Sequence, residues 1–212
     1  ENYFKSMDWL IEEIQREGVE VRLNSEGTPV IIEREKPDVV ILATGASPAV
    51  RLPHADSGII TAWEVLAGRE VGKRVLILGG GMVGIETAEF LSEKGCQVTV
   101  ITSREGTEKL ATDMEGTTRA LLLERLAVSE ISFMFAAQVV EVGKGRILVS
   151  QGEKRQWLEA ETIISAQGSQ SNQDLLRALE GKVPQILSIG DCVEPRSAKE
   201  AIHEGFGVGL QV

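Results

Sequence analysis

The sequence predicts an α/β fold built around a parallel sheet, and three observations support this prediction. Short apolar runs of the kind that form buried strands recur along the chain, helical patterns separate several of them, and one β-α-β unit is complete over residues 73–102. The 212 residues suffice for one or two small α/β domains with a sizeable core.

The composition is that of a globular protein with an acidic surface. Hydrophobic residues make up 42% and charged residues 25%, and 22 Lys and Arg against 32 Asp and Glu give a net charge of −10. This charge disfavours polyanions, so we expect no nucleic-acid partner. No apolar run has the length of a membrane span and no secretory leader is recognisable, so we expect no membrane partner and a cytoplasmic location.

The cysteines and histidines form no recognisable site. Cys96 and Cys192 lie far apart and make no Cys-x-x-Cys pair, which indicates two buried free thiols rather than a redox or metal site. Neither His54 nor His203 has metal-binding spacing. We therefore nominate no metal ligand and no catalytic acid, base or nucleophile.

The first elements are predicted from periodicity and from turn residues. Apolar residues repeat at helical spacing over residues 4–14, Gly18 can end that helix, and residues 19–23 alternate as in a strand. Residues 30–32 either belong to a helix capped by Thr28 or extend a strand.

A buried strand is expected at residues 39–43, and small residues follow it. Among them, Thr44 and Gly45 would let a bulky ligand lie close to the backbone, although an ordinary loop is an equal alternative. A connection to residue 61 and a short helix over residues 62–67 come next.

The complete β-α-β unit carries a glycine motif. After the continuously apolar strand 75–78, residues Gly79, Gly81 and Gly84 form G-x-G-x-x-G, and a helix and a strand at 98–101 follow. The first glycine of such a motif allows a tight turn, the second lets a pyrophosphate approach the backbone, and the third lets helix and strand pack closely. We therefore predict dinucleotide binding, with a purely structural turn as the alternative.

The start of that helix offers groups to the ligand. Met82 and Val83 open the helix, where free N–H groups and the positive end of the helix dipole would face phosphates. Glu86, expected in the first turn, would either contact the nicotinamide or ribose or only cap the helix.

Specificity should be set at the end of the second strand. An acidic residue there would bind the adenosine ribose, but this chain has Thr102, Ser103 and Arg104. A guanidinium with hydroxyl neighbours suits a 2′-phosphate, so we favour NADP over NAD. The alternative is that Arg104 is a solvated loop residue and that Glu105 or another group recognises the ribose.

The rest of the chain predicts a helix, a third parallel strand, an antiparallel meander, a return strand, a further helix and a last strand. These are expected at residues 114–126, 131–136, 138–158, 161–166, 172–180 and 186–189. The last strand ends in Gly190 and Asp191, before a helix from about Ser197. Such a carboxylate could hold a ribityl hydroxyl and the helix N-terminus a phosphate, or Asp191 could simply lie in a turn.

Three motifs together resemble those of flavoprotein reductases with two dinucleotide-binding domains. They are ILATGASP at 41–48, ILGGGMVGIETAEFL at 77–91 and ILSIGDCVEPRSAKEAIHEG at 186–205. The last, with TAWEVLAG at 61–68, is most similar to the NADH:flavin oxidoreductases that include 2,4-dienoyl-CoA reductase, 2-enoate reductase and trimethylamine dehydrogenase.

The resemblance implies a discontinuous architecture. Residues 73–158 would form a Rossmann-like three-layer NAD(P)-binding domain, inserted in an incomplete FAD-type domain of residues 1–72 and 159–212. Carried over by position, the NAD(P) fingerprint comprises Gly79, Gly81, Gly84 and Glu86, the strand-end motif comprises Thr44 and Gly45, and the FAD ribityl and pyrophosphate motif comprises Gly190 and Asp191.

One departure from the family pattern limits this inference. No first G-x-G-x-x-G precedes residue 43, and the flavin-binding barrel and iron–sulfur cysteine cluster of the relatives are absent. We therefore expect a fragment with an incomplete FAD site, whose partners are dinucleotides and the missing barrel and first β-α-β unit of its parent chain. An uncovered sheet edge also suggests self-association as a homo-oligomer.

The resemblance implies an activity for the parent. Hydride would pass from NADPH or NADH to FAD, with the cofactors supplying the chemistry, and the fragment alone would be inactive. His203 could approach the flavin or be merely structural. The alternative function is a non-catalytic ADP-binding or structural domain, since a fold does not fix a function.

Overall fold

The structure is a computed structural model that describes residues 2–52 and 58–212, so His54 lies outside the described residues. The chain divides into two compact units. The smaller unit comprises residues 1–41 and 174–187, and the larger unit comprises residues 42–173 and 188–212. The division into residues 73–158 and their flanking segments stays a prediction, because compactness groups residues by packing and not by the ligand they bind.

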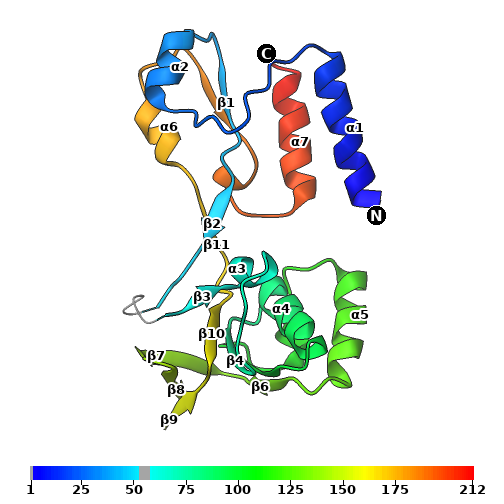
Figure 1. Cartoon of the computed structure of the whole chain (residues 1–212), viewed down its shortest axis with the longest axis vertical. Helices are drawn as coiled ribbons and strands as arrows, with labels where there is room; N and C mark the ends of the chain where they lie inside the picture. Colours follow the sequence, from blue (N-terminus) through cyan, green and yellow to red (C-terminus); the bar gives the residue numbers. More distant parts are fainter. Residues whose placement is uncertain (1, 53–57) are drawn as a thin grey trace. The chain divides into compact units, whose positions relative to one another are not determined.

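A five-stranded parallel sheet forms the centre of the larger unit (Figure 1), which confirms the predicted α/β class. In spatial order its strands are β3 (Ile60–Thr61), β10 (Thr162–Ser165), β4 (Arg74–Leu78), β5 (Gln97–Ile101) and β6 (Ser132–Met134). The sheet therefore extends beyond residues 73–158 at both ends of that segment.

The central strand β4 is buried on both faces because its side chains alternate between two apolar clusters. Ile77 packs in a cluster with the helices α3 (Ala62–Leu66), α4 (Met82–Glu93) and α5 (Gly116–Ala127). Leu76 and Leu78 pack in a second cluster with the meander strands. Helices, parallel sheet and meander thus make three layers, as a continuously apolar strand predicts.

The meander is antiparallel, as its short glycine turns predict. It consists of β7 (Ala137–Gly143), β8 (Arg146–Gln151) and β9 (Lys154–Glu159). Ile147 is fully buried beneath the sheet, while the Arg146 guanidinium lies 4.4 Å from the centre of the Trp157 ring on the meander.

The larger unit also contains four short elements and a helix. A two-stranded antiparallel ladder joins β2 (Ala46–Pro48) to β11 (Ser169–Ser171), and the 3-10 helices are η1 (Thr107–Lys109) and η2 (Gly190–Cys192). The helix α7 (Ala198–Gly209) begins at Ser197, which forms a capping box with Glu200.

The smaller unit contains α1 (Asn2–Arg16), α2 (Pro29–Glu35) and α6 (Asp174–Leu179). Thr28 accepts the Ile31 N–H at the start of α2, which decides the sequence ambiguity at residues 30–32 in favour of a helix. The strand β1 (Val40–Leu42) pairs with β12 (Ile186–Ser188), next to a 2.9 Å hydrogen bond from the Val40 N–H to the Gln185 carbonyl.

A predicted strand and the predicted burial of one cysteine are wrong. Residues 19–23 form no strand, and Leu23 is 81% exposed. A strand needs a neighbour that pairs with its N–H and C=O groups, and no described strand pairs with this segment. Cys192 is buried as expected, but the Cys96 thiol is only partly buried.

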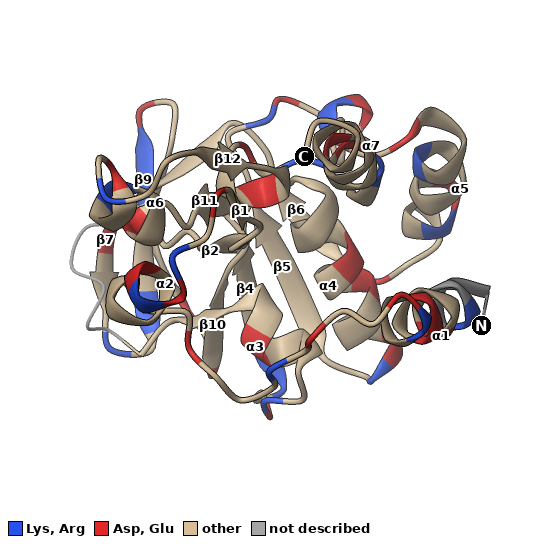
Figure 2. Ribbon diagram, turned by 90° about the horizontal axis from the view of Figure 1, so that it is seen from above, with Lys and Arg blue, Asp and Glu red and all other residues tan. Residues whose placement is uncertain are grey.

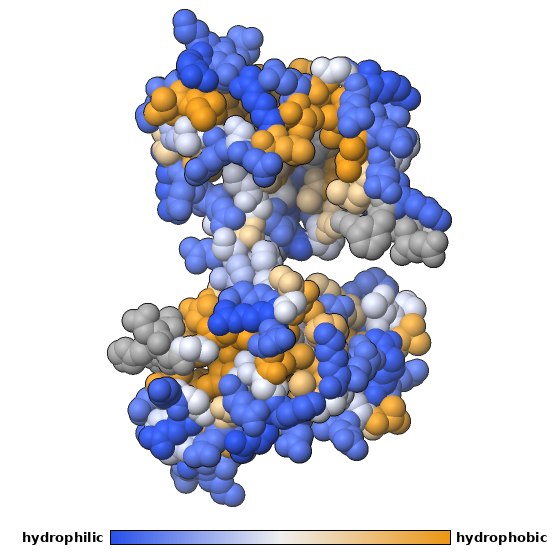
Figure 3. Space-filling view, in the orientation of Figure 1, coloured by the Kyte–Doolittle hydropathy of each residue, from blue (hydrophilic) through white to orange (hydrophobic). Residues whose placement is uncertain are grey.

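Charge and apolar surface are distributed unevenly. The buried polar side chains of the described residues are Thr87, Thr102 and Ser165, none of them charged, and in Figure 2 most charged residues lie on helices and loops, with others on β9. Apolar side chains also reach the surface (Figure 3), with Trp9 on α1 and Phe206 on α7 more than half exposed. Each of these helices leaves apolar area uncovered by the described residues of its own unit.

Candidate functional site

The turn between β4 and α4 needs two of the motif glycines for its backbone alone. Gly79 has φ +127°, and a Cβ atom on it would lie 2.2 Å from the Ala166 carbonyl oxygen. A Cβ on Gly84 would lie 2.1 Å from the Gly79 carbonyl oxygen. Both residues therefore fix the approach of α4 to the sheet.

The middle glycine has a different environment. Gly81 precedes α4 as its N-cap, with an ordinary φ of −77°. A Cβ there would meet only a side chain, since its nearest neighbours are the two Asp113 carboxylate oxygens at 3.1 and 3.6 Å. The backbone conformation at position 81 therefore does not require glycine. The lack of a side chain there leaves space at the start of the helix.

A cavity of about 550 Å³ opens beside this turn. It lies at the carboxyl ends of β4, β5 and β10, where ligands of open α/β sheets bind, and its volume is in the range of ligand sites. The glycine turn, these strand ends, the start of the meander and part of the loop before β3 line it. The lining includes Arg51, Gly79, Gly80, Gly81, Val83, Thr102, Ser103, Arg104, Asp113, Gln138 and Gln167.

The structure brings six of the predicted site residues together in this lining: Gly79, Gly81, Val83, Thr102, Ser103 and Arg104. Met82 and Gly84 adjoin them in α4 without lining the cavity. Glu86 also lies outside the lining. It is the fifth residue of α4, past the first turn, so the helix-capping role considered for it is wrong.

The Glu86 carboxyl has an altered proton affinity. Its side chain reaches the surface, yet partial burial of the carboxyl raises its pKa, and the neighbouring Glu89 and Asp113 carboxylates raise it further. The Glu86 carboxyl therefore lies near two other carboxylates at the edge of the site.

Thr102 and Arg104 have partners within the protein. The Thr102 hydroxyl accepts the Arg104 N–H at 3.2 Å and would clash with a Cβ on Gly80, so this buried side chain shapes the turn. The Arg104 guanidinium donates to the Thr112 hydroxyl at 2.6 Å and to the Lys109 carbonyl, and lies 3.9 Å from Asp113. It therefore faces the cavity but is held by the loop after η1.

Asp113 is the residue of this site that sequence reasoning missed. Its carboxylate accepts the Met82 backbone N–H at 2.9 and 3.1 Å, although it comes 31 residues later in the chain. No local spacing signals such a contact. The polar residues between β5 and α5 are typical of a loop, but they do not show where that loop packs.

Hydrogen bonds join the strand-end motif, Thr44 and Gly45, to the segment that follows β11. The Thr44 hydroxyl donates to the Asn172 carbonyl at 2.7 Å, and the Asn172 side-chain amide donates to the Thr44 carbonyl at 3.0 Å. Gly45 has φ +65° and accepts the Asn172 N–H. These residues join the two strands of the β2–β11 ladder at one end.

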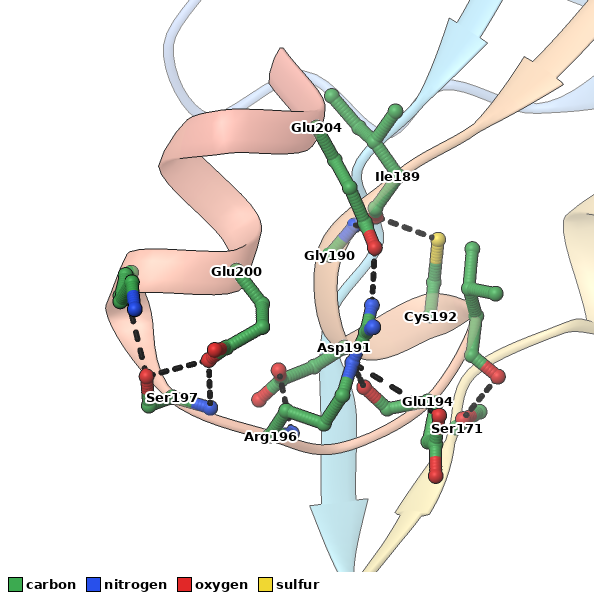
Figure 4. A network of polar contacts seen from close by, with 12 residues as sticks. Ser171, Ile189, Gly190, Asp191, Cys192, Glu194, Arg196, Ser197, Glu200 and Glu204 are labelled. Atoms are coloured by element: carbon green, nitrogen blue, oxygen red, sulfur yellow. Dashed lines mark hydrogen bonds and ion pairs between the residues drawn. The ribbon is translucent and has the colours of Figure 1, made fainter. Parts of the chain in front are cut away.

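The Gly190 and Asp191 motif lies in a polar network (Figure 4). The Gly190 N–H donates to the Glu204 carboxylate at 2.6 Å, and Asp191 accepts the Arg196 N–H at 3.2 Å. The Arg196 guanidinium also binds Glu204. The hydrogen bond from the Gly190 N–H, and next the one from the Arg196 guanidinium, lower the pKa of Glu204, which the sequence did not single out.

The remaining candidates are not assembled into a site. His203 is exposed on α7, and both cysteines are free. Within residues 2–52 and 58–212, no group of three His, Cys, Asp or Glu side chains could hold a metal ion. None of the described helices is long and apolar enough to cross a membrane.

Comparison with known proteins gives a family match. The sequence profile of the pyridine nucleotide-disulphide oxidoreductases matches residues 32–205. The chain is 34% identical to an NADH oxidase of Thermoanaerobacter brockii over 97% of its length, and 30% identical to a metal reductase of Desulforamulus reducens over 92%. It covers 32% and 34% of those proteins.

A solved structure has the same fold. A 2-naphthoyl-CoA reductase in complex with 2-naphthoyl-CoA matches with a TM-score of 0.85 and 26% identity. The match covers all of this chain and 32% of that one. The chain thus spans about a third of the length of the proteins it resembles.

Proposed function

The chain belongs to the pyridine nucleotide-disulphide oxidoreductase family, as its motifs predicted, and from this premise we propose that it binds NAD(P)H for a flavin-dependent oxidoreductase. The observation that carries the proposal is the cavity at the carboxyl ends of β4 and β5, next to the glycine turn and the start of α4. In the parent enzyme, hydride would pass from NAD(P)H to FAD, as in a 2,4-dienoyl-CoA reductase-like protein.

The residues present fit a dinucleotide. Gly81 leaves space that a Cβ would fill, and the first N–H groups of α4 lie beside that space. These groups would bind the pyrophosphate. The nicotinamide and the flavin supply the hydride chemistry when bound, so the contribution of this chain is to bind and orient them.

Arg104 supports a preference for NADP. It is the cation that lines the cavity at the end of β5, and residues 102–104, which follow that strand, include no carboxylate to accept ribose hydroxyls. To bind a 2′-phosphate, Arg104 would exchange its contacts with Thr112 and Lys109 for the ligand. If Arg104 instead kept those two contacts when the ligand is bound, we would expect a preference for NAD.

The FAD half of the proposal rests on the family pattern. Residues 1–72 and 159–212 would supply part of a FAD-type domain, with Thr44, Gly45, Gly190 and Asp191 near the flavin. The remainder of a parent chain would complete it, and the apolar surfaces of α1 and α7 are consistent with such a partner. Self-association at a sheet edge stays a prediction.

One observation favours a second function, a non-catalytic domain that binds ADP. Glu86, the residue expected at the nicotinamide, does not line the cavity, whereas the groups expected at the pyrophosphate and adenosine ribose do. Calorimetric titration with NADPH, NADH and ADP in parallel tests both proposals. Tighter binding of NADPH than of ADP supports the reductase, and equal binding of all three supports the ADP domain.

A further inference from the structure

The Asp113 carboxylate lies where a bound anion is expected. It accepts the Met82 N–H, the first N–H of α4, with both of its oxygens. It also lies against Gly81, within 3.1 Å of where a Cβ would stand. The space that the middle glycine leaves open is therefore bordered by a negatively charged side chain.

The loop that carries Asp113 is fixed to the glycine turn. The Ala111 N–H donates to the Gly80 carbonyl at 2.9 Å, and Leu110 and Ala111 are fully buried. Arg119 on α5 holds the same loop through the Leu110 carbonyl at 2.7 Å. Asp113 follows two residues later, so the backbone places it at the helix start, while its side chain remains 54% exposed.

The same carboxylate is linked to the cation of the site. Arg104 lies 3.9 Å from Asp113 and donates to the adjacent Thr112 hydroxyl. Asp113 therefore contacts both groups that a phosphate-bearing ligand would need, one N–H of the helix start and the Arg104 guanidinium. An arriving pyrophosphate would compete for the N–H and would be repelled by the carboxylate charge.

We propose that Asp113 competes with a dinucleotide for the pyrophosphate position at the start of α4 and so lowers the affinity of the site for dinucleotides. Rotation of this one side chain releases the Met82 N–H and removes the charge beside Gly81. The inference rests on the proposed nucleotide-binding function and adds a regulatory element to that site.

The test compares the wild-type chain with Asp113→Asn and Asp113→Ala by calorimetric titration. NADPH, ADP and inorganic pyrophosphate are the probes, because the last two lack a 2′-phosphate and report on the helix start alone. Glu108→Gln is the matched control, since Glu108 lies in η1, shortly before Asp113, and its carboxylate makes no hydrogen bond to α4.

We expect both Asp113 variants to bind all three probes at least about tenfold more tightly, as for a hydrogen bond to a charged group. The gain should shrink as salt is raised, while Glu108→Gln should leave affinity within about twofold. Unchanged or weaker binding in Asp113→Asn, with clear wild-type binding, would overturn this inference and leave the proposed function standing.

Two further outcomes are decisive. An equal gain in Glu108→Gln would show a general effect of net charge and would also overturn the role of Asp113. If neither the wild type nor either Asp113 variant binds any probe, the proposed function fails and this inference fails with it.

Discussion

A Cβ atom on Gly84 would lie 2.1 Å from the carbonyl oxygen of Gly79, so these two residues together set the closeness of α4 to the end of β4. The contact is with backbone, which cannot move aside as a flexible side chain can. The third glycine of the motif is thus required by packing before any ligand is considered.

Gly84→Ala should therefore destabilise the protein. We expect a loss of at least about 2 kcal/mol in the free energy of unfolding, measured by urea denaturation, because an added methyl group overlaps a fixed carbonyl. Gly116→Ala is the control, since a Cβ on Gly116 at the start of α5 meets nothing within 4 Å. Equal stability of the two variants would contradict the packing role.

The core beneath α5 gives a second test of the fold. Leu122 is 1% exposed in the cluster on the helical side of the sheet, while its neighbour Leu121 is 54% exposed. Leu122→Ala should cost about 2–5 kcal/mol and Leu121→Ala less than about 1 kcal/mol in the same denaturation experiment. Similar losses would mean that α5 packs with another face.

Sequence reasoning succeeded where the signals are local. The apolar run before Gly79, the glycine spacing and the periodicity after Met82 lie within one short segment, so they predict the β-α-β unit and the turn in it. The meander could be predicted for the same reason, because each of its turns contains a glycine beside residues that alternate between apolar and polar.

It failed where structure depends on distant partners. Residues 19–23 alternate as a strand should, but alternation cannot supply a pairing neighbour. Asp113 and Glu204 reach backbone N–H groups 31 and 14 residues away in sequence, and both contacts depend on how loops return to the sheet or to η2. Neither contact can be inferred from residue type or spacing.

Arg104→Glu should weaken NADPH binding more than NADH binding, by about tenfold or more in the ratio of the two affinities. The reason is that a carboxylate in place of the guanidinium would repel a 2′-phosphate. Arg155→Glu on β9 makes the same charge change outside the cavity lining and should leave the ratio unchanged. Equal loss for NADPH and NADH would rule out the 2′-phosphate role.

The Glu204 network predicts a pH dependence of stability. The folded state lowers the pKa of this carboxyl, so its contribution is complete above the unfolded-state value of about 4.3 and is lost as the pH falls through the lower folded-state value. Glu204→Gln should lower the Tm at pH 7, and its difference from wild type should shrink below about pH 4.

The control for that experiment is Glu180→Gln, which removes an exposed carboxylate after α6. Its Tm should follow that of the wild type at both pH values. A Glu204→Gln deficit that persists undiminished at pH 3 would show that the ionised carboxylate does not stabilise the Gly190 turn.

The most direct test of the account is calorimetric titration of the chain and of Gly81→Ala with NADPH. The variant should fold, because the new Cβ meets only the Asp113 side chain, and near-identical circular dichroism would verify this. We predict one dinucleotide bound per wild-type chain, displaced by ADP, and at least about tenfold weaker binding in Gly81→Ala. Equal binding by the two proteins would place the nucleotide elsewhere and contradict the assignment of the β4–α4 turn as the dinucleotide site.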